Sequence, residues 1–249
     1  MRSQIKINLT NEILLYDATQ ILGLIATGYM QNPLNWFPDD ANFILMGATH
    51  KTIPGPTSGL IMTNNLSLAE TFDLKINPDY LRNVQLDNIV CLLFSLLELE
   101  SFGIEYFTRM QQLINSVAKK LETNKMDIIK TRNGLYSSTH QLWLSMPEKK
   151  LLKFEQNAII AGVSLNIRRR RIYNYHGVRL GFQQIARYNW EDKDAEIIAT
   201  ILLNLCDNSC NHPKIQQLIN LLSPKKVHFT FDETILKSVH SILHNSNMQ

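Results

Sequence analysis

Residues 42–61 read NFILMGATHKTIPGPTSGLI, and an earlier stretch at residues 13–17 reads ILLYD. Each contains a short apolar run that is typical of a buried strand and that is followed by polar residues. The Pro-Gly-Pro sequence in the longer stretch predicts a turn, after which the chain returns as another strand. Because residues at the ends of buried strands converge in a crevice, we expect Asp17 and Lys51 to lie close together.

Further helices and strands are expected around this stretch. Apolar residues at steps of three and four predict an amphipathic helix over 104–121, and the apolar density of residues 86–99 predicts a separate, buried helix. Asn189 and Asp192 resemble an N-cap for a helix at residues 195–205. Other helices are expected at residues 18–28 and 148–161 and from Pro213 and Asp232, and other strands at residues 141–146, 163–167 and 178–181. Strands that alternate with helices predict an α/β protein.

The composition is that of an ordinary globular protein. Of the 249 residues, 45% are hydrophobic and 19% are charged, and the formal net charge is +3. This charge is too small to predict a nucleic-acid partner, and no apolar run is long enough to span a membrane. Residues 1–6, MRSQIK, lack the apolar run of a signal peptide. We therefore expect a cytoplasmic protein.

The cysteines predict reduced thiols. Cys91, Cys206 and Cys210 cannot form a fully paired set of disulfides and are too few for a metal cage. Cys206, Cys210 and His212 lie close in sequence, as zinc ligands do, but no second ligand pair accompanies them. We expect a helix end with unreactive thiols and no metal site. The four arginines at residues 168–171 suggest either an anionic partner or the solvated face that charge runs usually form.

Three motifs resemble those of serine hydroxymethyltransferase and its relatives among the fold-type-I pyridoxal-phosphate enzymes. Residues 17–28 and 49–61 resemble the family's two central motifs in order, spacing and chemistry. Residues 176–181, HGVRLG, resemble its Gly-x-Arg-x-Gly segment. The resemblance extends from about Asn11 to about Leu205.

The resemblance implies a fold and a division into domains. A partial aminotransferase-like large domain, which binds pyridoxal 5'-phosphate, is expected at residues 1–105. A smaller α/β C-terminal domain is expected at residues 106–249.

The resemblance also implies the roles of four residues. Lys51 holds the cofactor as a Schiff base with His50 beside it, and burial next to a cationic ring favours the neutral, nucleophilic amine. Asp17 pairs with the pyridine nitrogen and keeps it protonated, so that the ring withdraws electrons from the substrate's Cα. Arg179 binds the substrate carboxylate with its planar guanidinium and so selects the bond to Cα that breaks.

Two further cofactor contacts are expected, although the motifs depart from the family there. Gln20 stands where the family has a histidine, and it can donate a hydrogen bond to the phenolic oxygen but cannot carry a proton. Thr49 matches a threonine of the threonine-rich segment that precedes the lysine in the family. The glycine-rich loop that contacts the phosphate in the family is not recognisable between Thr63 and Leu86.

The implied activity is that of a transferase or aldolase. It acts on the Cα–Cβ bond of a β-hydroxy amino acid or glycine by aldol, transaldol or hydroxymethyl transfer, and the use of tetrahydrofolate stays open. In the family a long segment precedes the strand that ends in the aspartate, whereas few residues precede it here. We expect a separately encoded subunit to supply this amino-terminal half and to form a heterodimer or heterotetramer with the chain. A truncated or degenerate gene product would have the same sequence.

Several alternatives stay open at the level of sequence. The chain can be a noncatalytic regulatory or scaffold subunit that retains the fold, which the glutamine and the unrecognised phosphate loop favour. The joint presence of Asp17, Lys51 and Arg179 argues against this alternative. Taken singly, Asp17 can be a helix N-cap, Lys51 a solvated lysine in a loop and Arg179 a surface arginine of a strand.

Overall fold

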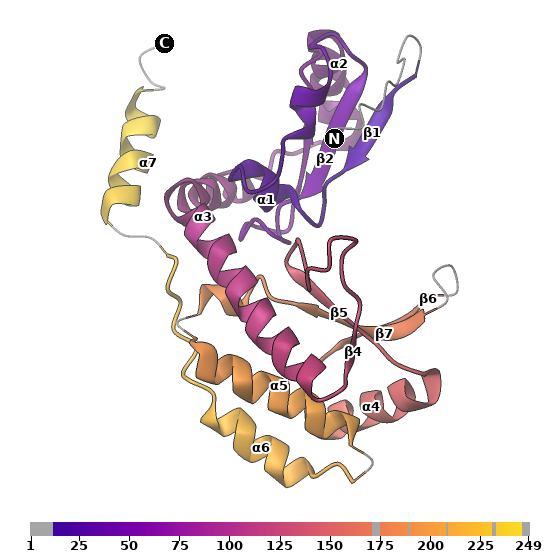
Figure 1. Cartoon of the computed structure of the whole chain (residues 1–249). Helices are drawn as coiled ribbons and strands as arrows, with labels where there is room; N and C mark the ends of the chain where they lie inside the picture. Colours follow the sequence, from indigo (N-terminus) through magenta and orange to yellow (C-terminus); the bar gives the residue numbers. More distant parts are fainter. Residues whose placement is uncertain (1–11, 171–174, 189, 208, 231–232, 246–249) are drawn as a thin grey trace. The chain divides into compact units, whose positions relative to one another are not determined.

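The chain is an α/β protein, as predicted, and its computed structural model describes residues 12–170, 175–188, 190–207, 209–230 and 233–245 (Figure 1). The strands are β1 (Leu14–Asp17), β2 (Phe43–Ala48), β3 (Gly59–Met62), β4 (Asp127–Ile128), β5 (Gln141–Ser145), β6 (Asn166–Arg170) and β7 (Tyr175–Gly181). The helices are α1 (Leu22–Ala26), α2 (Leu66–Lys75), α3 (Leu86–Thr123), α4 (Glu148–Ile160), α5 (Asp192–Cys206), α6 (His212–Leu221) and α7 (Glu233–Asn245). Single helical turns occur at η1 (Pro33–Trp36), η2 (Ile76–Tyr80) and η4 (Ile185–Arg187).

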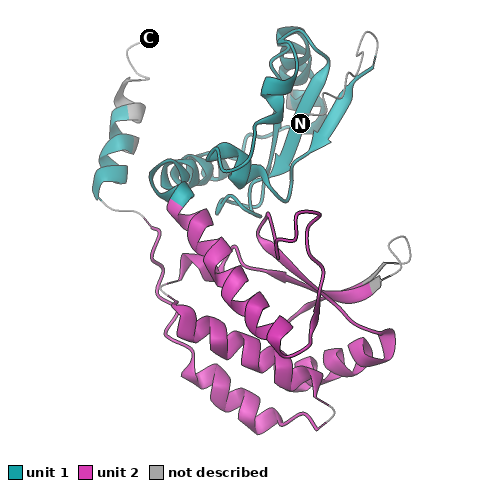
Figure 2. Ribbon diagram, viewed as in Figure 1, with its two compact units in different colours: residues 1–104, 231–249 teal, residues 105–230 magenta. Residues whose placement is uncertain are grey.

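The chain divides into two compact units. Unit 1 comprises residues 1–104 and 231–249, and unit 2 comprises residues 105–230 (Figure 2). The expected second domain included residues 231–249, which group with unit 1 in the structure. A cluster of apolar side chains joins α7 to the first half of α3, because Ile235 and Leu97 are buried together there.

Helix α3 is one continuous helix of 38 residues, whereas two helices were predicted. The only residue near the expected break that disfavours a helix is Gly103, and a helix tolerates an isolated glycine. A Cβ at Gly103 would collide with the side chain of Thr27, so this glycine permits the close approach of α1. The prediction that residues 86–99 are buried is wrong for the first turns, where Leu86, Ile89 and Val90 are exposed.

Unit 1 contains a three-stranded sheet in the order β1-β2-β3. Strands β1 and β2 are parallel, with Asp17 opposite Met46, and β3 returns antiparallel to β2. An aromatic cluster covers one face of the sheet, in which Phe37 stacks on Phe43 and Trp36 meets Tyr16 edge to face. The predicted strands are therefore confirmed, and the short helical turn η1 closes this face of the sheet.

Unit 2 contains an antiparallel sheet in the order β4-β5-β7-β6. One face is buried, with Leu142, Leu144 and Val178 completely inaccessible, and Figure 1 shows helices α3, α4 and α5 gathered on one side of this sheet. Strand β6 begins three residues later than predicted. Gly162 has a φ of 68° and Val163 N–H donates to the Ala158 carbonyl, so these residues end α4 before the strand can start.

Local hydrogen bonds explain the other differences from the predicted elements. Helix α1 begins only at Leu22, because residues 19–21 form a turn after β1. Helix α2 was not predicted, since none of its residues is buried and no apolar face marks it, but Asn65 caps it by accepting from Leu68 N–H. Helix α5 is capped at Glu191, whose N–H donates to Asp194, and the predicted cap Asn189 lies outside the described residues.

Candidate active site

The lysine loop, residues 49–58, connects β2 to β3 and is closed by Thr49. The Thr49 N–H donates to the Ser58 carbonyl at 3.0 Å, and its hydroxyl donates to the Pro56 carbonyl at 2.6 Å. Gly55 N–H donates back to the Thr49 carbonyl at 3.0 Å. Thr49 is fully buried, so the structure gives it a role in shaping the loop, and its predicted contact with the cofactor stays a prediction.

Two further contacts fix the lysine loop to its neighbours. Gly23 N–H of α1 donates to Thr52 Oγ1 at 3.0 Å, and a Cβ at Gly23 would lie 2.5 Å from the Thr52 carbonyl oxygen. Ser95 of α3 donates its hydroxyl to the Pro54 carbonyl at 3.1 Å. The loop is thus anchored to a helix on each side, which fixes the backbone from which Lys51 extends.

Lys51 and His50 are the accessible residues at the start of this anchored loop. His50 is exposed and Lys51 is half-buried, whereas Thr52 and Ile53 immediately after them are buried. The Lys51 side chain therefore starts from a fixed backbone while part of it stays accessible.

Asp17 is the last residue of β1 and is held by the residues that follow it. Thr19 N–H donates to Asp17 Oδ1 at 2.9 Å, and the hydrogen bonds from Thr19 lower the pKa of this carboxyl group. Asp17 does not cap α1, which has Ile21 at its N-cap. Its carboxylate is exposed and stays ionised at neutral pH, as a partner for a protonated ring nitrogen must.

The parallel pairing of β1 and β2 places Asp17 and the lysine loop at the same edge of the sheet. Ala18 N–H donates to the Met46 carbonyl at 2.7 Å, so the two strands are still paired where β1 ends. Lys51 follows β2 by three residues. In parallel sheets this carboxyl edge is where ligands bind. Gln20 lies in the turn that leaves the same edge and is half-buried.

Arg179 lies in unit 2, in the middle of β7. It is paired with Trp143 of β5 on one side and with Asn166 of β6 on the other. Its guanidinium carbon lies over the Trp143 ring, 6.0 Å from the centroid, which is within reach of a cation–π interaction. The sequence did not single out Trp143 for this role, although an aromatic residue at a polar position of an alternating strand was a signal for it.

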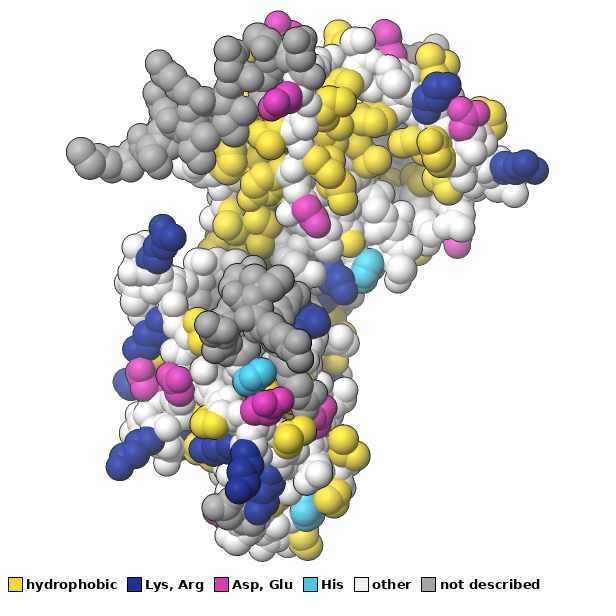
Figure 3. Space-filling view, turned by 90° about the vertical axis from the view of Figure 1, so that its right-hand side faces the viewer, with side chains coloured by type: hydrophobic (Ala, Val, Ile, Leu, Met, Phe, Trp, Pro, Cys, Tyr) yellow, Lys and Arg dark blue, Asp and Glu magenta, His cyan; other side chains and the backbone are white. Residues whose placement is uncertain are grey.

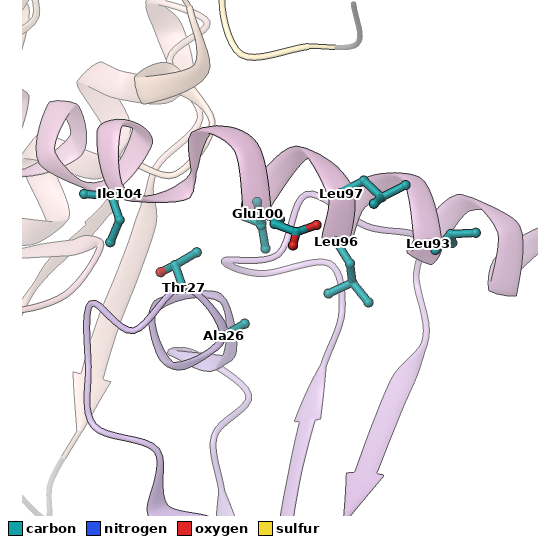
Figure 4. Close-up of a pocket in the computed structure, with 8 residues that line it drawn as sticks. Ala26, Thr27, Leu93, Leu96, Leu97, Glu100 and Ile104 are labelled. Carbon is teal, nitrogen blue, oxygen red and sulfur yellow. The ribbon is translucent and has the colours of Figure 1, made fainter. Parts of the chain in front are cut away.

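A pocket in unit 1 lies elsewhere, between the end of α1 and the first half of α3. It has a volume of about 490 Å³, and Figure 4 shows Thr27 facing leucines of α3 with Glu100 among them. Its lining is apolar apart from Thr27 and Glu100 and includes neither Asp17 nor Lys51. An apolar pocket with one carboxylate does not fit an anionic cofactor, so we do not assign the cofactor to it.

Three other features bear on function. No glycine occurs between Thr63 and Leu86, where α2 and η2 stand in place of a glycine-rich phosphate loop. Among the residues that the structure describes, no group of His, Cys, Asp and Glu side chains could hold a metal ion. None of the described helices is both long and apolar enough to cross a membrane.

Comparisons with known proteins agree with the motifs. Serine hydroxymethyltransferase of Staphylothermus marinus is 30% identical over 197 residues, which are 76% of this chain and 44% of that protein. Fluorothreonine transaldolase of Streptantibioticus cattleyicolor is 29% identical over 212 residues, 83% of this chain and 32% of that protein. No protein-family model matches the chain.

A solved structure has the same fold. L-Threonine transaldolase from Pseudomonas fluorescens, in its internal aldimine state, superposes with a TM-score of 0.76 and 26% sequence identity. The match covers 92% of this chain and 54% of the transaldolase. The chain thus spans about half or less of the length of each of these relatives. By sequence and by fold, the chain is a homologue, over part of their length, of the serine hydroxymethyltransferase-like enzymes of the fold-type-I pyridoxal-phosphate class.

Proposed function

We propose that the chain provides the lysine, the ring-nitrogen carboxylate and the substrate-binding arginine of a pyridoxal-phosphate enzyme. Its reaction makes or breaks the Cα–Cβ bond of a β-hydroxy amino acid or glycine, by aldol, transaldol or hydroxymethyl transfer. The observation that carries this proposal is the placement of Asp17 and the lysine loop at the carboxyl edge of two adjacent parallel strands. The names of the relatives support the type of reaction.

The chemistry of the residues at this edge fits pyridoxal 5'-phosphate. When bound, the cofactor supplies an aldehyde and an aromatic ring that withdraws electrons from the substrate's Cα. Lys51 provides a half-buried amine for the aldehyde, and His50 stands next to it in the chain. The ionised Asp17 provides the charge that keeps a ring nitrogen protonated. Gln20 provides an amide donor at the same edge.

Arg179 has the chemistry to bind the substrate's α-carboxylate. Its guanidinium can bind a carboxylate in a bidentate arrangement, and the ring of Trp143 restricts the orientation of that guanidinium. By holding that carboxylate, Arg179 would fix the orientation of the substrate's Cα and so determine which of its bonds reacts. We propose that Arg179 selects the reaction in this way.

We further propose that a separately encoded subunit completes the enzyme, in a heterodimer or heterotetramer. The supporting observation is the face of the unit 1 sheet that the aromatic cluster does not cover. On this side Ile13, Leu15 and Ile61 are between 49% and 59% exposed. In Figure 3 apolar side chains gather over unit 1 on the side where β1 lies in Figure 1. An exposed apolar face of this kind marks a site for further polypeptide.

Cofactor binding by Lys51 is tested by the colour of the purified protein. The chain is expressed with and without the product of the neighbouring gene, and pyridoxal 5'-phosphate is added. We expect a yellow protein whose colour is lost in Lys51→Ala and kept in Lys75→Ala, because Lys75 is an exposed lysine of unit 1 that forms an ion pair with Asp79. Colour that survives in Lys51→Ala would falsify the assignment of Lys51. Colour that requires the second gene product supports the two-subunit proposal.

The absence of glycine between Thr63 and Leu86 favours a second candidate, a noncatalytic subunit with the same fold. The two candidates differ in what a coloured, complete complex does with β-hydroxy amino acids. The release of an aldehyde from L-threonine, measured with and without tetrahydrofolate, identifies an enzyme and shows whether it needs folate. A coloured complex that is inert toward β-hydroxy amino acids and glycine identifies the noncatalytic subunit.

A further inference from the structure

The outward face of the four-stranded sheet carries a second arginine near Arg179. We define the outward face as the side opposite the buried residues Leu142, Leu144 and Val178. Arg168 of β6 is paired with Gly177 of β7, two residues before Arg179. Paired residues, and residues two apart on one strand, share a face, so the two arginines are diagonal neighbours with Cβ atoms about 7 Å apart.

The Arg168 side chain lacks a partner in the described part of the chain. It is half-buried, and its Nε is buried without a hydrogen-bond acceptor from any described residue. No described carboxylate forms an ion pair with it either. A buried donor without an acceptor destabilises a fold and requires an explanation, of which an anionic ligand is one.

Among the described residues, the neighbours of Arg168 in its row across the sheet provide no acceptor for its Nε. Gly177 of β7 pairs with Ser145 of β5 on one side and with Arg168 of β6 on the other, so the three residues form a row across the sheet. Gly177 has no side chain, and a Cβ there would collide with the Leu144 carbonyl oxygen. Asp127 lies at the other end of the same row, on β4 opposite Ser145. Three strand spacings separate Asp127 from Arg168, which is about 14 Å, too far for a direct ion pair.

We propose that Arg168 binds a second anionic group of the substrate, a carboxylate or a phosphate, while Arg179 binds the α-carboxylate. The proposal rests on the proposed function of Arg179 and names the class of substrate: a small molecule with two anionic groups. Two guanidinium groups on neighbouring strands match the two ends of a short dicarboxylate or of a phosphorylated amino acid. Recognition of the second charge separates such substrates from neutral amino acids of the same size.

The test compares each ligand that has two anionic groups with a counterpart that lacks the second one. Calorimetry with the full chain, without cofactor, measures the binding of succinate against its monoamide succinamate, and of O-phospho-L-serine against L-serine. We expect at least one ligand with two anionic groups to bind about tenfold more tightly than its counterpart without the second group, as a charge-assisted hydrogen bond provides. The pair that shows the preference identifies the second group as a carboxylate or a phosphate.

Three variants assign the preference to Arg168. Arg168→Gln should remove the preference for the ligands with a second anionic group and leave the binding of succinamate and serine unchanged. Unchanged binding of these two ligands also shows that the variant is folded. Arg168→Lys should retain part of the preference, because the charge remains. Arg109→Gln makes the same charge change at another half-buried arginine, on helix α3, and should retain all of it.

The outcomes separate this proposal from the proposed function. Equal binding of the ligands with and without the second anionic group by the wild-type chain, or a preference that survives in Arg168→Gln, overturns the role of Arg168. Arg179→Gln should lower the affinity for all four ligands. If it does not, the result counts against Arg179 alone. No step of the measurement depends on Lys51, so the ratio of affinities is decisive whether or not the chain binds pyridoxal 5'-phosphate.

Discussion

Thr52 has a buried hydroxyl that holds the backbone next to Lys51. Its Oγ1 accepts the N–H of Gly23, which is buried and lies at the start of α1. Thr52→Val keeps the shape of the side chain but leaves this N–H without an acceptor. We expect the variant to lower the free energy of unfolding by about 1–3 kcal/mol, the cost of an unpaired buried donor, in urea denaturation.

Thr57→Val is the matched control for that prediction. Thr57 lies in the same loop but is exposed, and exposed substitutions usually change stability by less than about 0.5 kcal/mol. Equal losses of unfolding free energy in Thr52→Val and Thr57→Val would show that the hydrogen bond to Gly23 does not hold the loop.

The cysteines differ in reactivity because of their burial. Burial raises the pKa of the Cys206 thiol to about 11, whereas Cys91 is exposed. Since the thiolate is the nucleophile, we expect iodoacetamide at pH 8 to alkylate Cys91 well before Cys206, as followed by mass spectrometry of the peptides. The rate at Cys206 should rise about tenfold per pH unit below its pKa. Alkylation of both at the same rate would mean that the α5 end opens readily.

At the scale of an element, the start of α5 depends on Asp194. Its carboxylate accepts the N–H groups of Glu191 and Ser223, and although burial opposes its ionisation, these hydrogen bonds lower its pKa. Asp194→Ala removes a helix cap and a tie to the segment after α6, so we expect a loss of about 2 kcal/mol in urea denaturation at pH 7.

The same carboxylate predicts a pH dependence. A carboxylate with a lowered pKa in the folded chain stabilises the fold above its unfolded pKa, and this stabilisation disappears as the pH falls through the folded value. The difference between wild type and Asp194→Ala should therefore shrink at acidic pH, below about pH 4. Glu196→Ala, which breaks an exposed ion pair with Lys120, is the control and should show a much smaller difference at pH 7.

The elements that could be predicted are those with a clear pattern of apolar residues within their own sequence. Strands β1, β2 and β5 have short apolar or alternating runs, and α4 has a clear period, so their positions follow from local pattern. Helix α2 has no apolar face that would mark it, and the apolar pattern of α3 does not show that its two halves form one helix. Apolar periodicity therefore identifies neither helix α2 nor the full length of α3.

The same limit applies to the residues of the candidate site. Asp17 and Lys51 could be placed at one edge because the two runs before them are strands, and ends of neighbouring strands converge. Trp143 and Arg168 could not be linked to Arg179, since that requires the register of three strands. A shift of the register by one residue would turn these side chains to the opposite face.

At the scale of the whole molecule, the exposed apolar face of unit 1 predicts self-association. Leu15 and Ile61 lie on the face of the sheet that the aromatic cluster does not cover, since both share the face of the β2 residues Ile44 and Met46. We expect the chain expressed alone to form concentration-dependent oligomers in light scattering and to bind a hydrophobic dye. The double variant Leu15→Lys, Ile61→Lys should reduce both signals.

Ile159→Lys is the control for this prediction. Ile159 of α4 is 72% exposed but lies in unit 2, outside the sheet of unit 1. A decrease as large as that of the double variant would mean that apolar residues in general, and not this face, drive association.

The anchoring of the lysine loop has a consequence for mutational scanning. Gly23, Thr49, Thr52 and Gly55 are constrained by hydrogen bonds and close packing, so substitutions there should reduce cellular abundance together with any activity. Substitutions at the accessible His50 and Lys51 should change activity while abundance stays normal. A library that reports both quantities would therefore separate the chemically reactive positions from their scaffold, even while the natural substrate is unidentified.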